Sequence, residues 1–376
     1  MEHYLDNAAT TKPCAEAAAA VMSCISAHYG NPSSLHRKGL EAQHEVEYAR
    51  NQIAGALGCK AQEIVFTSGA TESSNLAIRG AAAAYGRKRK KIVASAVEHA
   101  SVKATLSYLE TLGFTVVTVP PAADGEYHTE DFLREIDSSV CLVSIMLVNN
   151  ENGCRLPVEN VFRMVKRNDP EIITHCDAVQ GFLKIPFKPR TLCADLVSVS
   201  GHKVHALKGV GALYIRHGVR VKPILCGSEQ ERGLRPGTES VPLIASFGAA
   251  TEKLSLNIEE RLERVSQLRS SLIAQLREMD GVIIRDIEGA SPYVLNISLL
   301  GYRSEIVLHY LEQREVYVSS GSACSKGASS GVLELFGAKP AEVDSALRIS
   351  FCAENTEEDI AALVQGLRDA QKELMH

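Results

Sequence analysis

Apolar and polar positions along the first two thirds of the chain alternate between short apolar runs and longer mixed segments. The runs are rich in β-branched residues, as in buried strands, and they lie before Ser68 and at 91–96, 114–119, 140–148, 171–176, 194–200 and 211–216. Between them the pattern favours helices at 15–27, 39–57 and 100–112. This βαβα order predicts an α/β fold with a mainly parallel sheet flanked by helices.

The pattern changes near residue 250. Apolar positions at helical spacing from Ile258 to Leu276 predict a long amphipathic helix. Strands at 293–299, 315–319 and 346–352, a helix at 304–314 and a last helix after Thr356 follow without a βαβ rhythm. We therefore expect a large domain at 15–250 and a smaller α+β domain made of 1–14 and 251–376.

Length and charge limit the possible functions. The chain has 376 residues, enough for two cores, and its net charge of −5 gives no reason to expect a nucleic-acid partner. The one basic run, at 87–91, is best explained as a solvated loop before a strand. The N-terminus has no signal pattern and no apolar run is long enough to span a bilayer, so we expect a cytoplasmic protein without membrane contact.

Ten cysteines are scattered along the chain. None forms a Cys-x-x-Cys pair, so neither a zinc site nor a disulfide framework is predicted, and most are expected to be small buried side chains. Cys324 differs because it lies in a run of small and polar residues from Ser319 to Gly331, beside Lys326. We expect this loop to be exposed and mobile, with Lys326 favouring the thiolate of Cys324.

Lys203 follows the strand at 194–200 through Gly201, where the backbone can turn sharply. Ligands of open α/β sheets sit at the carboxyl ends of strands, and a desolvated lysine there can attack a carbonyl. A surface lysine in a loop is the simpler interpretation of this stretch alone. Other polar residues gather at predicted strand ends, although each alone can be structural: Thr71, His99, Asn150, Asp177, Gln180, Ser200 and His202.

The stretch from Glu63 to Ser73 reads as a strand, a turn of small residues and a helix start. Free N–H groups and hydroxyls at such a turn suit a phosphate. An ordinary capped helix start explains the stretch equally well, and it has no Gly-Lys-Ser/Thr of a Walker loop.

Taken together, the motifs of this chain are similar to those of one family. They are, in order, Leu5–Thr11, Gly30–Ser34, Thr67–Ser73, Asn149–Glu151, His175–Gln180, Ser200–Lys203, Arg235–Thr238 and Gly321–Cys324. The chain resembles, nearly end to end, the cysteine desulfurases of the NifS/IscS type. These belong to the class V aminotransferases, pyridoxal-phosphate enzymes of fold type I, and the resemblance implies that fold and that cofactor.

The resemblance implies how the cofactor would be held. Lys203 would bind it as a Schiff base, Asp177 would pair with the ring nitrogen, and His99 would stack on the ring as a further catalytic residue. The other cofactor contacts implied by the resemblance are Ala70, Thr71, Ser200 and His202 at the phosphate, Thr238 from the other subunit of a homodimer, and Gln180 with Asn150 at the phenolic oxygen.

The resemblance also implies a reaction. Arg348, with Asn150 nearby, would hold the carboxylate of L-cysteine, and Lys203 would remove its α-proton. The Cys324 thiolate would then attack the substrate sulfur, leaving alanine and a persulfide for a sulfur-acceptor protein. The acceptor would serve iron–sulfur cluster assembly or tRNA thiolation.

Other functions remain open at this point. Another class V enzyme, an aminotransferase or a selenocysteine lyase, would also use Lys203, although an aminotransferase has no need of Cys324. A non-enzymatic sulfur carrier would keep the fold. Two departures from the family pattern stand out: Asn152 replaces the usual isoleucine, and Val204–Leu207 replaces a stretch with Gly-Pro. We expect the second to change how rigidly Lys203 is held.

Overall fold

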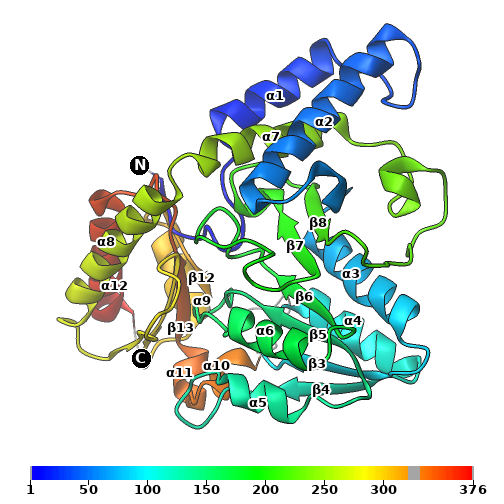
Figure 1. Ribbon diagram of the computed structural model, residues 1–376. Helices are drawn as coiled ribbons and strands as arrows, with labels where there is room; N and C mark the ends of the chain where they lie inside the picture. Colours follow the sequence, from blue (N-terminus) through cyan, green and yellow to red (C-terminus); the bar gives the residue numbers. More distant parts are fainter. Residues whose placement is uncertain (1, 321–330, 375–376) are drawn as a thin grey trace.

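The computed structural model describes residues 2–320 and 331–374, which form two main sheets with helices around them (Figure 1). The larger sheet has seven strands in the order β2-β8-β7-β6-β5-β3-β4, and all are parallel except β8. Its strands are β2 (Ile64–Thr67), β3 (Lys91–Ser95), β4 (Thr115–Val119), β5 (Val140–Met146), β6 (Ile173–Asp177), β7 (Leu196–Ser200) and β8 (Gly211–Ile215). The predicted parallel sheet is confirmed.

Helices cover both faces of this sheet because its buried strands send alternate side chains to opposite sides. On β3, Ile92 and Ala94 join a core with α3 and α4, whereas Val93 joins the core of the other face. The helices of this part are α1 (Ala15–Ser26), α2 (Arg37–Leu57), α3 (Ala70–Tyr85), α4 (Ala100–Thr111), α5 (Thr129–Arg134), α6 (Val158–Asn168) and α7 (Val241–Ser255). In Figure 1, α1, α2 and α7 lie together at one end.

The smaller sheet is antiparallel, in the order β12-β13-β10-β9. Its strands are β9 (Val282–Arg285), β10 (Val294–Leu299), β12 (Ser319–Ser320) and β13 (Ala346–Ser350). A separate pair joins β1 (His3–Tyr4) to β11 (Val316–Tyr317). The helices are α8 (Ile258–Leu276), α9 (Ser304–Glu312), α10 (Val332–Leu335), α11 (Pro340–Asp344) and α12 (Glu357–Glu373). Helices α8 and α12 pack side by side beside this sheet (Figure 1).

Local signals fixed several helix ends as expected. Gly58 caps α2 in the left-handed conformation, with a φ of 66°. Thr356 and Asp359 form a capping box at the start of α12. The long amphipathic helix is α8, with the predicted bounds.

The fold differs from the prediction in several places: α5, α6 and β9 were not predicted, and two further differences have a packing cause. Residues 315–319 do not form one strand, because β11 pairs with β1 while β12 pairs with β13. Helix α7 was not predicted, and it is buried on most sides by α1 and α2, so it shows little of the polar face that marks an amphipathic helix. Gly248 allows the close approach of α2, since a Cβ there would lie 2.6 Å from Cα of Ala49.

The N-terminal segment touches both parts of the molecule. Leu5 packs in the core of the smaller sheet, and its carbonyl accepts a hydrogen bond from Ser350 N–H at 2.7 Å. A few residues later, Thr11 N–H donates to the carbonyl of His202 at 2.9 Å. The domain limits at 14 and 250 stay a prediction. Within residues 2–320 and 331–374, every helix is too short or too polar to cross a bilayer.

Candidate active site

A cavity of about 930 Å³ lies at the carboxyl ends of β6 and β7. Most of the predicted site residues line it: Ala70, Thr71, His99, Asn150, Asp177, Gln180, Ser200, His202, Lys203 and Arg348. Thr238 does not, and it is exposed between Gly237 and α7. Cys324 and the loop at 321–330 lie outside the described residues, and Ser319 and Ser320 of β12 line the cavity just before them. Parallel strand ends therefore bring most predicted residues to one place.

Lys203 ends a short 3-10 helix, Gly201–Lys203, that follows β7 directly. Its Nζ donates to the carbonyls of Ala8 and Ala9 at 2.5 and 2.7 Å, so the N-terminal segment positions it. Burial, and after it the charge of Arg348, lowers the pKa of Lys203 to about 8. An amine with this pKa is partly neutral near pH 7 to 8, as a nucleophile or proton acceptor must be.

Asp177 lies at the end of a strand, and His99 lies at the start of a helix. Asp177 ends β6, is buried, and accepts a hydrogen bond from Val179 N–H at 3.0 Å. Burial raises the pKa of Asp177 because it disfavours the charged carboxylate. A cationic partner in the cavity would stabilise that carboxylate. His99 is the N-cap of α4, and its Nδ1 accepts from Ser101 N–H at 3.2 Å. Desolvation lowers the pKa of His99, so the ring is neutral at pH 7.

The start of α3 provides an anion site on the same cavity. Its N-cap, Gly69, has a φ of 152° and no side-chain cap, so the first N–H groups of the helix are left for another partner. Gly211 of β8 makes room for this turn, since a Cβ there would lie 2.7 Å from the Gly69 backbone. Oγ of Ser200 is buried without a hydrogen-bond partner among the described residues. These N–H and O–H groups are hydrogen-bond donors that an anion could occupy.

Arg348 reaches the cavity from the smaller sheet. It sits in β13 opposite Ser319 of β12. One terminal nitrogen donates to Asp6 Oδ1 at 2.8 Å and the other to the Asn150 carbonyl at 3.2 Å. Its Nε has no partner among the described residues. The guanidinium is held in place from both sides, as a carboxylate clamp should be.

Gln180 is held by groups of the protein itself. Its Nε2 donates to the Ala8 carbonyl, and its Oε1 accepts from Lys184 Nζ, both at 2.9 Å. One N–H of this amide remains for a ligand. Lys184 was not predicted, although it lies only four residues after Gln180, and burial lowers its pKa to about 7.

Glu98 was also missed by the sequence analysis. This carboxyl lines the cavity, is 2% exposed, and accepts hydrogen bonds from Ser95 Oγ at 2.6 Å and Met146 N–H at 2.7 Å. Burial raises the pKa of Glu98 to about 8, so it is largely protonated at pH 7. Its place beside His99 was the only signal in the sequence.

The two departures from the family pattern are now visible in the structure. Asn152 is buried in a turn, where its N–H donates to Asn149 Oδ1 at 3.2 Å and its own Oδ1 accepts from Cys154 N–H at 3.0 Å. Residue His205, in the second departure, has a φ of 59°, and its N–H donates to Thr11 Oγ1 at 2.7 Å. The loop after Lys203 is therefore tied to the N-terminal segment.

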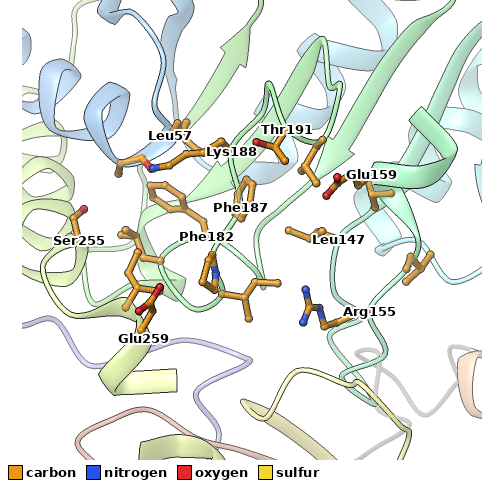
Figure 2. A pocket seen from close by; sticks show the side chains of 18 of the residues that line it. Leu57, Leu147, Arg155, Glu159, Phe182, Phe187, Lys188, Thr191, Ser255 and Glu259 are labelled. Atoms are coloured by element: carbon orange, nitrogen blue, oxygen red, sulfur yellow. The ribbon is translucent and has the colours of Figure 1, made fainter. Parts of the chain in front are cut away.

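A second hollow, of about 760 Å³, lies elsewhere on the molecule (Figure 2). Phe182 and Phe187 surround it together with Leu57, and Lys188 and Glu159 are among its polar side chains. It contains none of the predicted site residues. The chemistry is therefore placed in the cavity around Lys203.

Comparison with known proteins agrees with this arrangement. The family model described as aminotransferase class-V matches residues 3–363. The chain belongs to the class V aminotransferase family. It is 38% identical over 368 residues to a cysteine desulfurase of Trichormus azollae, covering 96% of this chain and 91% of that one. It is 39% identical over 329 residues to the cysteine desulfurase IscS of Dictyoglomus turgidum, covering 87% and 83%.

Solved structures give the same result. A NifS-like protein superimposes with a TM-score of 0.94 at 36% identity, over 100% of both chains. A protein described as SspA in complex with cysteine has a TM-score of 0.81 at 30% identity, over 95% of this chain and 100% of that one. The fold is that of the class V, fold-type I enzymes, and the predicted α/β fold is confirmed.

Class V enzymes of this kind depend on pyridoxal phosphate, and the cavity fits that group. Its phosphate suits the start of α3, which has no side-chain cap, and the Oγ of Ser200, which has no partner in the part of the chain that the structure describes. The buried carboxyl of Asp177 suits a cationic ring nitrogen, and Lys203 is an amine of lowered pKa between them.

Proposed function

We propose that the chain is a cysteine desulfurase that removes sulfur from L-cysteine and releases L-alanine. The observation that carries the proposal is the cavity lined by both Lys203, an amine of lowered pKa, and Arg348, whose Nε has no partner among the described residues. The curated relatives named above are cysteine desulfurases, which supports the same activity. An aminotransferase would also use Lys203 and Arg348, but it would have no need of Cys324.

Arg348 holds the substrate carboxylate in this proposal. Asp6 and the Asn150 carbonyl fix two of its nitrogens, so the guanidinium loses little freedom when it binds a ligand. Asn150 lies beside the same ligand. This clamp places the α-carbon of cysteine toward Lys203.

Lys203 moves the proton. With a pKa near 8, its amine accepts a proton from the α-carbon at neutral pH, and the Ala8 and Ala9 carbonyls are positioned to receive its N–H groups. Pyridoxal phosphate, when bound, supplies the electron sink that makes this proton acidic. Asp177 would pair with the ring nitrogen and favour its positive charge, and neutral His99 would lie against the ring.

Cys324 takes the sulfur. Its thiolate attacks the substrate sulfur, an S–S bond forms as the Cβ–S bond breaks, and the carbon keeps the electron pair and takes up a proton. The products are alanine and a persulfide on Cys324. The neighbouring Ser319 and Ser320 line the cavity, which supports the entry of this segment into the site.

The test is mass spectrometry of the purified protein after brief exposure to L-cysteine, with alanine measured in parallel and no keto acid added. We expect one added sulfur on Cys324 and on none of the other nine cysteines at comparable occupancy. Cys324→Ser should keep the visible absorbance of the bound cofactor and lose persulfide and sulfide release. A persulfide mainly on Cys176 or Cys352, with Cys324→Ser still active, would contradict the mechanism.

We further propose a homodimer that delivers sulfur to an acceptor protein in the cytoplasm. Thr238 is exposed and does not line the cavity of its own chain, consistent with a contact across the dimer. Large apolar side chains on and around α1 and α2 are exposed and available for burial: Met22, Ile25, Tyr29, Leu35, Leu40 and Tyr48. The nine cysteines described are all free, as in a reducing compartment. Light scattering with size exclusion tests the dimer.

A further inference from the structure

Three side chains that are far apart in the sequence meet behind Lys203. His205 lies two residues after the lysine, and Cys352 and Glu354 follow β13. One ligand atom from each lies within 4.8 Å of the others, and His205 Nε2 is 3.6 Å from Glu354 Oε2. Bonds of 2.0–2.3 Å at a tetrahedral zinc put neighbouring ligand atoms roughly 3.3–3.8 Å apart, so small side-chain rotations complete this geometry.

The three residues border a small cavity of about 20 Å³. That volume is close to what one water molecule or one metal ion needs. His205 and Cys352 are half-buried, whereas the Glu354 carboxylate is 56% exposed, so an ion can enter from the solvent on the side of Glu354. The cluster is separate from the cofactor cavity, although Lys203 borders both.

The histidine is already oriented for a ligand. Its Nδ1 lies 2.9 Å from the Lys12 carbonyl, which fixes the proton on Nδ1 and leaves the lone pair of Nε2 facing Glu354. A backbone carbonyl bound to the second nitrogen is the usual support of a metal-bound histidine. The backbone of His205 is in the left-handed region at a φ of 59°, a strain that surrounding contacts must hold in place.

The surrounding charges define what the cluster can accept. Three cationic side chains also border the small cavity, and each donates to an oxygen of the protein: Lys184 to Oε1 of Gln180, Lys203 to the carbonyls of Ala8 and Ala9, and Arg261 to those of Leu183 and Leu254. A thiolate and a carboxylate carry two negative charges, which balance a divalent cation. Imidazole, thiolate and carboxylate together are ligands of zinc rather than of magnesium or calcium.

We propose that His205, Cys352 and Glu354 bind one zinc ion, with a water molecule as the fourth ligand and the thiol proton released to solvent. The ion joins the loop after Lys203 to the end of the strand that carries Arg348. It therefore holds together the two parts of the molecule that form the active site. This inference does not depend on the proposed function.

The test uses the full-length protein with bound cofactor and with Cys324→Ser, so that the proposed catalytic thiol does not bind metal. Co²⁺ is the probe, because a cobalt–thiolate bond gives an intense near-ultraviolet absorption band. We expect one Co²⁺ per chain with this band, displaced by Zn²⁺, and a rise in melting temperature when Zn²⁺ is added.

Variants identify the ligands. Cys352→Ser should abolish the band, and His205→Asn should weaken Co²⁺ binding at least about 100-fold, since losing even a supporting partner costs 10–100-fold. Asparagine tolerates the left-handed backbone, so this variant should fold. Glu354→Gln changes an exposed side chain and should also weaken binding.

Two controls match these variants. Cys226→Ser removes the exposed cysteine and should keep the band, and His128→Ala removes the histidine of the exposed Asp124–Glu126–His128 group and should do the same. The proposal is overturned if the starting protein shows no band, if the band survives Cys352→Ser, if His205→Asn binds Co²⁺ as tightly as the starting protein, or if Cys226→Ser removes the band.

Discussion

The seven-stranded sheet and the four-stranded sheet both border the active-site cavity, but they contribute to it in different ways. In the larger sheet, parallel strands point the same way, so the turns after β6 and β7 bring Asp177, Ser200 and Lys203 to one edge. The smaller sheet is antiparallel and its strand ends do not converge. It contributes Arg348 from the middle of β13, whose neighbours Leu347 and Ile349 face the core.

Two arginines of the smaller sheet show how much depends on position. Arg285 of β9 donates to Asn296, Ser298 and Glu342 at 2.8–3.0 Å. Its charge is therefore paired with a carboxylate of α11 and is not offered to a ligand. Arg348 lines the cavity, and within residues 2–320 and 331–374 its Nε has no hydrogen-bond partner. Strand direction therefore predicts the site residues of the larger sheet. In the smaller sheet, only packing separates an arginine that can bind a ligand from a structural one.

The largest effect is expected at the edge of the larger sheet. Lys203→Ala removes the anchor of the cofactor and the proton acceptor together, so kcat/KM with L-cysteine should fall by more than about 10⁴-fold. The measurement is alanine release, together with the visible absorbance of the cofactor. Lys222→Ala is the control, because this exposed lysine does not line the cavity and should leave both unchanged. Full absorbance and turnover in Lys203→Ala would show that another lysine is the anchor.

The next prediction compares the two arginines directly. Arg348→Ala should lower kcat/KM by about 10²–10³-fold, mainly through KM, because a charge-assisted bidentate contact to the substrate is lost. Arg285→Ala should lower the melting temperature, since Glu342 loses a half-buried partner, with kcat/KM within about threefold of wild type. Equal kinetic losses in the two variants would remove the distinction between the sheets.

The smallest effect is expected on the free energy of unfolding, when Lys184 is replaced. Burial holds its pKa at about 7 in the folded protein, below the ordinary 10.5, so the folded state binds fewer protons than the unfolded state between these values. The destabilisation is complete below pH 7 and is lost as the pH rises toward 10.5. Lys184→Met should therefore be more stable than wild type at pH 6 by about 2–4 kcal/mol, after loss of the hydrogen bond to Gln180.

Urea unfolding at a series of pH values measures this difference. We expect the advantage of Lys184→Met to shrink as the pH rises from 7 to 10. Lys188→Met is the control, because this lysine is on the same segment and exposed, and its advantage should be near zero at every pH. A constant advantage for Lys184→Met across the range would mean that its pKa is not lowered by burial.

The sequence by itself determined what depends on neighbours along the chain. Alternation and strand composition determine the parallel sheet, and glycine and capping residues set the ends of α2 and α12. Because parallel strands share a direction, the residues that follow them, from Thr71 to Lys203, were also predictable as one site. The roles of Arg348 and Cys324 came from resemblance to a family rather than from the pattern.

Only the tertiary structure decided the rest, because it depends on which distant segments come together. Packing against α1 and α2 buries α7 and hides its periodicity, and separate partners split residues 315–319 between two sheets. The Ala8 and Ala9 carbonyls meet Lys203 only after the N-terminal segment crosses both parts of the molecule. Likewise, His205 meets Cys352 and Glu354 across the join between the sheets, and no spacing along the chain marks that meeting.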